Sequence, residues 1–231
     1  AERMAQPPEA FIQRVDGTYT QRPELVSDGS VVREQYQRAL GLAPNDAVVL
    51  CRYLIWVLHS VHIREEEPRS VSIAHSEGRP VAHRPGTVGE VERLAREGAL
   101  LEPENAFYPF VLSLLHLGQG RHNHALAALE RAASAREFNL HVKEATQAHI
   151  RLARLGGLPQ MEAQWAARVQ TVNLGFKAYA LCRSFARMTC SRGDRAREAG
   201  DHQTAIRWYV GAFRLATLLG ETGWEELDVL V

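Results

Sequence analysis

The amino-acid sequence predicts an all-α fold in which antiparallel helical hairpins are stacked side by side. Small and aromatic residues recur at helical spacing in Ala205, Tyr209 and Ala212. Two helices approach to about 8–10 Å only where their contact residues are small, so this pattern is typical of a packed hairpin. Similar helix boundaries recur around Pro44 and Pro103, where proline stops one helix and a polar residue caps the next. These observations together predict repeated hairpins.

The segment 198–213 resembles a tetratricopeptide repeat. In that family the first helix ends at a Gly-Asp turn, here Gly200-Asp201, and the second helix presents small residues inward. Gly193 is the matching small residue on the first helix. The resemblance implies a right-handed superhelix, or α-solenoid. Parts of the same signature occur in 36–46, 99–106 and 117–126.

The chain divides into a lead-in at 1–27 and a helical repeat domain at 28–231. The lead-in is rich in proline and predicts an extended segment. Pro103 follows Pro44 by more than the repeat period of about 34 residues, and an inserted loop at 64–86 accounts for the excess. Within this loop Ser70–Ala74 alternates like a strand, but it is too isolated to predict a sheet.

The expected helices follow from apolar residues at helical spacing and from the proline and glycine residues between them. Gly156 and Pro159 separate two of them, and Gly220 ends the last. The predicted helices span about 31–40, 46–62, 87–101, 104–117, 121–135, 140–155, 159–172, 174–199 and 201–219.

Composition bears on partners and compartment. Lysine plus arginine equals aspartate plus glutamate at 27 each, so no net field attracts nucleic acid or an anionic membrane. The most apolar stretch, Val48 to Val61, is broken by Arg52 and His59 and does not predict a membrane span. The chain begins at Ala1 rather than Met, which leaves the compartment open. A cytoplasmic location is favoured, and an exported or membrane-anchored soluble domain is the alternative.

Residues that carry chemistry are sparse. The three cysteines have no metal-binding or disulfide spacing, and no nucleophile or phosphate-loop motif occurs. We therefore expect no enzyme activity and no cofactor. His59 and His62 lie three residues apart and precede Glu65 to Glu67, a pattern that also suits a solvated helix end. A metal-dependent or small-molecule activity at 59–67 is kept as a third hypothesis.

The function that the sequence favours is non-catalytic binding of another protein or peptide, as a scaffold or assembly subunit. The family resemblance implies a concave groove lined by the first helix of each hairpin. A structural or sensory domain of a membrane-anchored or exported protein is the alternative. The apolar groove residues are equally compatible with a place in the core. The candidate groove residues are Phe107, Phe110, Leu114, Arg187, Asp194 and Arg197.

Overall fold

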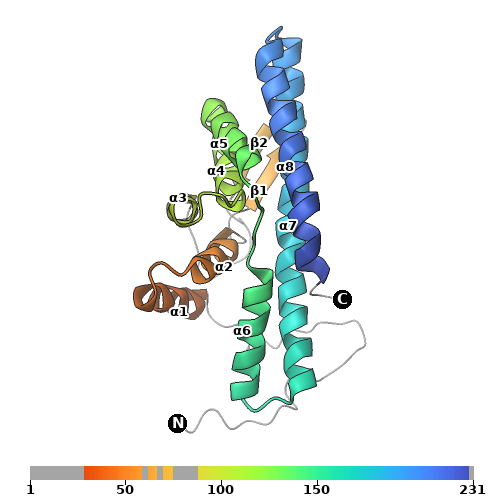
Figure 1. The fold of residues 1–231 in the computed structure, drawn as a ribbon. Helices are drawn as coiled ribbons and strands as arrows, with labels where there is room; N and C mark the ends of the chain where they lie inside the picture. Colours follow the sequence, from red (N-terminus) through yellow and green to blue (C-terminus); the bar gives the residue numbers. More distant parts are fainter. Residues whose placement is uncertain (1–28, 59–61, 67–69, 75–87, 229–231) are drawn as a thin grey trace.

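The computed structural model of this 231-residue chain describes residues 29–58, 62–66, 70–74 and 88–228. Within these ranges the chain is helical apart from one β-hairpin, which confirms the predicted all-α class (Figure 1). The lead-in at 1–27 lies outside the described residues. The elements are α1 (Gly29–Leu42), α2 (Ala47–Leu58), β1 (His62–Glu66), β2 (Ser70–Ala74), α3 (Val88–Leu101), α4 (Phe107–Gly118), α5 (His122–Ser134), α6 (Val142–Leu155), α7 (Gln160–Glu198) and α8 (His202–Asp228).

Successive helices pack as neighbouring pairs from α1 against α2 to α4 against α5, and again from α6 against α7 to α7 against α8. The long helix α7 pairs with α6 near its N-terminal end and with α8 near its C-terminal end (Figure 1). Outside this sequential order, α8 also packs against α5. This contact joins the hairpin α7–α8 to the hairpin α4–α5 and leaves the opposite side of α8 facing away from α5.

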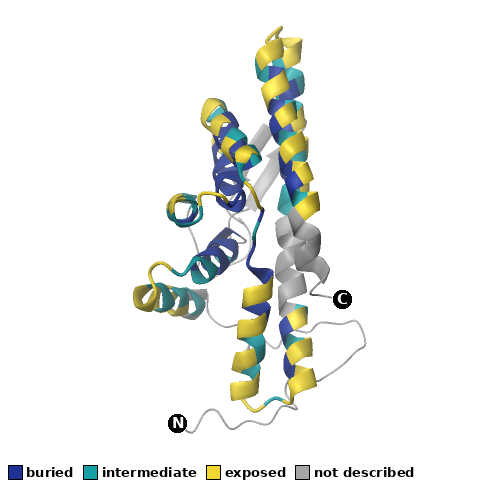
Figure 2. Ribbon diagram, in the orientation of Figure 1, coloured by how far each residue is buried: buried dark blue, intermediate teal, exposed yellow. Residues whose placement is uncertain are grey.

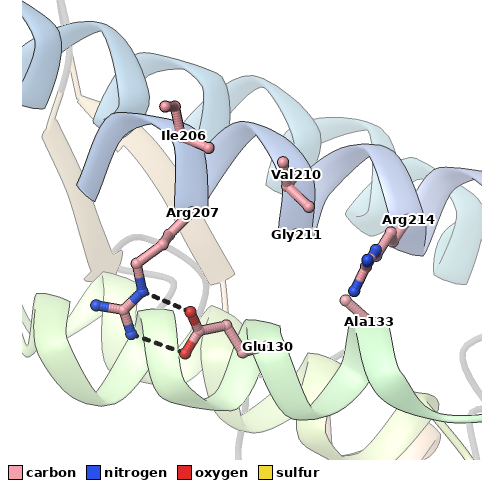
Figure 3. A pocket seen from close by; sticks show the side chains of 7 residues that line it. All are labelled: Glu130, Ala133, Ile206, Arg207, Val210, Gly211 and Arg214. Carbon is pink, nitrogen blue, oxygen red and sulfur yellow. Dashed lines mark hydrogen bonds and ion pairs between the residues drawn. The ribbon is translucent and has the colours of Figure 1, made fainter. Parts of the chain in front are cut away.

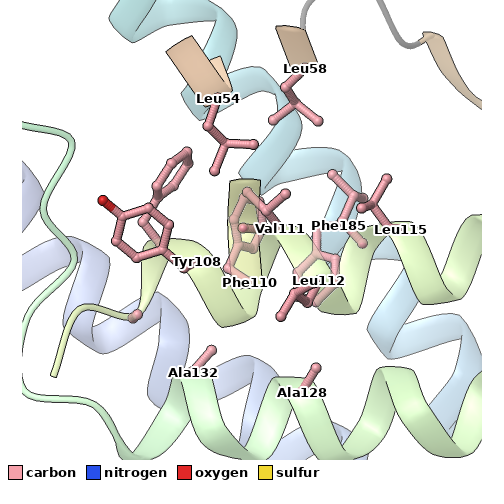
Figure 4. Packing of buried hydrophobic residues seen from close by; sticks show 14 of the residues in the cluster. Leu54, Leu58, Tyr108, Phe110, Val111, Leu112, Leu115, Ala128, Ala132 and Phe185 are labelled. Carbon is pink, nitrogen blue, oxygen red and sulfur yellow. The ribbon is translucent and has the colours of Figure 1, made fainter. Parts of the chain in front are cut away.

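Helix α4 lies at the centre of the core. Every residue from Phe107 to Leu117 is buried, so α4 is covered on all sides rather than on one face (Figure 2). Its side chains meet those of α2, α5 and α7 in one continuous apolar cluster (Figure 4). A helix that is apolar all round requires such cover, because each buried leucine or phenylalanine contributes about 1.5–3 kcal/mol only when water is excluded.

Local capping follows the sequence signals. The Asp46 carboxylate accepts a hydrogen bond from the Val49 amide at 3.0 Å, and the Asp201 carboxylate accepts one from the Thr204 amide at 3.0 Å. Such N-caps stabilise a helix by about 1 kcal/mol. Gly200 adopts φ 81°, a left-handed conformation that favours glycine, and so turns the chain from α7 into α8. The predicted Gly-Asp turn is therefore confirmed.

Two glycines allow two helices to come unusually close. A Cβ atom on Gly98 of α3 would lie 2.1 Å from the Tyr108 ring of α4. A Cβ atom on Gly193 of α7 would lie 2.5 Å from the Tyr209 ring of α8. Each tyrosine ring occupies the space that a side chain on the facing helix would need. Gly193 therefore has the close-approach role that the sequence predicts.

A buried polar cluster joins the α3–α4 loop to the segment between α5 and α6. The Glu102 carboxylate accepts hydrogen bonds from the Tyr108 hydroxyl at 2.9 Å and the Asn105 amide at 3.1 Å, and it pairs with His141 at 3.0 Å. Asn105 also exchanges two hydrogen bonds with the Asn139 backbone. Burial alone would raise the pKa of Glu102, but hydrogen bonds from His141 and Tyr108 outweigh it and lower the pKa.

Several predicted boundaries are wrong. The helix predicted to reach His62 does not include that residue, because residues 62–66 form β1 and pair antiparallel with 70–74 from His62↔Ala74 to Glu66↔Ser70. The expected loop is thus a β-hairpin over much of its first half, where β2 gains a neighbour in α4. Residues 75–86 lie outside the described part. Residues 159–199 were expected to form two helices, but α7 is continuous because no proline interrupts it.

We expect Gly98→Ala to lower the free energy of unfolding by about 1–3 kcal/mol, because its methyl group would overlap the Tyr108 ring. Gly41→Ala is the matched control. A Cβ atom there meets nothing within 4 Å, so this helical alanine should stabilise by up to about 1 kcal/mol. Urea unfolding of both variants measures the difference. Equal effects would show that α3 and α4 are not in close contact at Gly98.

Acidification should weaken the Glu102 cluster. Because the pKa of Glu102 is lowered in the folded chain, its contribution is complete above the unfolded value near 4.5 and is lost as the pH falls through the folded pKa. Glu102→Gln should therefore destabilise by about 1–3 kcal/mol at neutral pH. The difference from the wild type should shrink below pH 4. Urea midpoints across this range measure it, and a pH-independent difference would contradict the lowered pKa.

Candidate functional site

The groove expected on α4 is closed by the chain itself. Phe107, Phe110 and Leu114 are each 1 % exposed, so they occupy the core, the alternative that the sequence left open for them, and do not line an open groove. The Phe110 ring centroid lies 5.0 Å from that of Phe185 on α7 and 5.8 Å from that of Phe138, which precedes α6. Edge-to-face contacts of this kind fill the face that a peptide ligand would need.

The second set of predicted groove residues lies on α7 and is largely open. Arg187 and Arg197 are exposed, and Asp194 is half-buried. The Asp194 carboxylate pairs with Arg197 at 3.4 Å and accepts a hydrogen bond from the Tyr209 hydroxyl of α8 at 2.7 Å. The structure therefore brings Asp194 and Arg197 together and holds them against α8. Their role in binding a partner stays a prediction.

The predicted groove residues on α4 and those on α7 occupy equivalent positions of the hairpins α4–α5 and α7–α8. An offset of 80 residues places Gly120 on Gly200 and Ala125 on Ala205. Ser113 then corresponds to Gly193. In α4–α5 the Ser113 hydroxyl donates a hydrogen bond to the Ala125 carbonyl at 2.7 Å, which marks the same close approach. By this offset Phe107, Phe110 and Leu114 correspond to Arg187, Cys190 and Asp194.

The same helical position is thus buried and apolar on α4 but polar on α7. Helix α7 packs on the face of α4, whereas the corresponding face of α7 leaves Arg187 and Cys190 exposed. The terminal hairpin α7–α8 therefore presents, to solvent, the face that the α4–α5 hairpin buries.

Helix α8 carries an exposed apolar stripe that sequence reasoning missed. Ile206, Val210 and Phe213 are 59 %, 42 % and 72 % exposed, and their spacing places them on one face of the helix. The opposite face buries Trp208 and Leu215. The sequence signal for this stripe is that α8 has apolar residues on two opposite faces, because a single neighbouring hairpin covers only one of them.

A shallow hollow of about 200 Å³ borders this stripe between α5 and α8. Figure 3 shows Ile206 and Val210 on α8, with the Arg207 guanidinium reaching across to Glu130 on α5. The two hydrogen bonds of this ion pair measure 2.6 and 2.8 Å and lower the pKa of the Glu130 carboxyl. Arg214 extends over the other end of the hollow (Figure 3). We call Ile206, Val210 and Phe213 the α8 stripe.

The described histidines and carboxylates form no group of three that could hold a metal ion. Of the residues behind the metal hypothesis, His59 and Glu67 lie outside the described part, and His62 begins β1 instead of ending a helix. His116 and His124 are neighbours, with ring centroids 5.6 Å apart, and burial lowers the pKa of His116.

Among the helices of the described ranges, none is both long enough and apolar enough to span a bilayer. Comparison of the chain with protein-family models, curated proteins and solved structures gives no significant match.

Replacing each of two phenylalanines by alanine should separate core from surface. Phe110→Ala removes a ring that is 1 % exposed and should destabilise by about 3–5 kcal/mol, the usual effect of a core cavity. Phe213→Ala, at 72 % exposed, should change stability by no more than about 0.5 kcal/mol. Chemical unfolding of both variants measures this. A small effect of Phe110→Ala would mean that the α4 face is open.

Proposed function

We propose that this protein is a non-catalytic protein-interaction module, a scaffold or assembly subunit that binds its partner through the exposed face of its terminal hairpin. The observation that carries the proposal is the α8 stripe, three large apolar side chains that are between 42 % and 72 % exposed. Beside it lie Arg187, Asp194 and Arg197 on the open face of α7. An apolar centre with a polar rim is the usual composition of a protein-binding surface.

The architecture supports this reading. In stacked helical hairpins each repeat leaves an apolar face for its neighbour, whereas a face that meets water is polar. The outer face of α8 carries Ile206 and Phe213, so it is not built as a polar cap. A stacked arrangement like that of the tetratricopeptide repeats, with the α8 stripe on its exposed surface, is the finer fold that we propose.

The proposed binding surface differs from the groove that the family resemblance implies. The apolar part of that groove, on α4, is occupied by Phe138 and Phe185. The polar part of the prediction, Asp194 and Arg197, adjoins the α8 stripe through the hydrogen bond to Tyr209. We therefore keep protein binding as the proposed function and place it on the outside of the terminal hairpin.

Capture experiments with the immobilised chain test the proposal. Phe213→Asp should abolish retention of protein partners from the native cell extract, because a carboxylate in the α8 stripe would be desolvated on binding. Leu152→Asp is the matched control, since Leu152 on α6 is 64 % exposed and lies outside the stripe. Both variants should keep the wild-type thermal midpoint. Retention by Phe213→Asp equal to that of the wild type would refute the proposal, as would equal loss with Leu152→Asp.

A further inference from the structure

The contact between α8 and α5 shows how one helix packs on the outer face of a hairpin in this chain. Helix α8 packs on α5 with the backbone of Gly211 against the Leu129 side chain, where a Cβ atom would lie 2.8 Å from Leu129 Cγ. Beside this crossing, Arg207 of α8 pairs with Glu130 of α5. Ala133, one turn further along α5, lines the adjoining hollow. The face of α5 that contacts α8 thus has an apolar side chain, Leu129, that packs against a glycine, and a charged residue, Glu130, at its edge.

The α8 stripe lies at the equivalent position of the next hairpin. By the 80-residue offset that matches Gly120 to Gly200, the residues Leu129, Glu130 and Ala133 correspond to Tyr209, Val210 and Phe213. Leu126, one turn before Glu130, becomes Ile206. The face with which α5 receives α8 is therefore repeated on α8, and there it is exposed. The geometry that buries α8 on α5 is available to one more helix.

The charges at the rim of the α8 stripe indicate the chemistry of that helix. Arg214 follows Phe213 directly, and Arg187 lies on α7 two turns before Asp194, which contacts Tyr209. Continuing this antiparallel pairing brings Arg187 level with Ala216, about one helical turn beyond Phe213. Both arginines are exposed, and neither forms an ion pair with any residue that the structure describes.

We propose that the α8 stripe binds an amphipathic α-helix of a partner protein, with acidic residues beside Arg187 and Arg214. Its apolar face covers Ile206, Val210 and Phe213, and a glycine or alanine at its crossing point lies over Tyr209, as Gly211 lies over Leu129. Apolar anchors supply the affinity of such a helix, and the complementary charges supply its orientation. A second copy of this chain fits less well, because an antiparallel α8–α8 contact would bring arginines of like charge together.

Selection from a displayed library of helical peptides tests this inference, which rests on the proposed function. The library fixes leucines at i, i+4 and i+7 and randomises the crossing and flanking positions. Selection on the wild-type chain should enrich acidic flanks and a small crossing residue. With the double variant Arg187→Glu and Arg214→Glu, the selected acidic peptides should bind about tenfold more weakly. A library selected on the variant should enrich basic flanks.

Arg151→Glu, an exposed charge reversal on α6, is the control and should leave binding unchanged. If the selected peptides lose binding to the Phe213→Asp variant but carry no acidic flanks, the inference is overturned while the proposed function stays intact. The inference is also overturned if no selected peptide loses binding to the Phe213→Asp variant. Self-association of the free chain through the stripe, measured by sedimentation and abolished by Phe213→Asp, would replace the partner helix by a second copy.

Discussion

The close approach of paired helices is the constraint on which the rest of this structure depends. At Gly98 and Gly193 a tyrosine ring from the next helix occupies the place of a side chain. At Ser113 the hydroxyl bonds to the facing backbone instead. Such contacts fix which face of each helix meets its partner and therefore which face is left for the following hairpin. Because this close contact recurs in successive helix pairs, each pair leaves a similar face for a neighbour. On the hairpin α7–α8 that face, the α8 stripe, is exposed among the described residues.

The length of α7 then determines which surface of α4 is buried. Its 39 residues extend past α4 far enough to pair with α6 as well as α8, and its Phe185 packs on Phe110. The inner face that a shorter helix would leave as a groove is part of the core. Near α5 the exposed apolar surface is instead the outer face of α8, where Ile206 and Phe213 are more than half exposed. The same packing rule thus closes one surface and opens the other.

Local features of the fold could be predicted because nearby residues encode them. The cap at Asp46, the turn at Gly200 and the small residue at Gly193 depend on residues within a few positions or on one adjacent helix. The burial of Phe110 could not, because helical spacing shows that a face is apolar without showing which distant segment covers it. For the same reason the sequence does not show that the α8 stripe is left exposed. The β-hairpin escaped prediction because β2 has α4 as a neighbour, a contact set by the tertiary fold.

The chain carries a native probe for the contrast between the open and the closed face. Cys190 is exposed on α7 at the position that corresponds to Phe110, whereas Cys51 is fully buried and burial raises the pKa of Cys182 to about 12. The decisive measurement is the rate of thiol modification of Cys190 in the native wild type, compared with that of Leu114→Cys in a chain with Cys190→Ser. We expect Cys190 to react as fast as a free exposed thiol and the cysteine at position 114 to react only on unfolding. Equal rates at the two positions, or protection of Cys190, would contradict a closed α4 face and an open terminal hairpin.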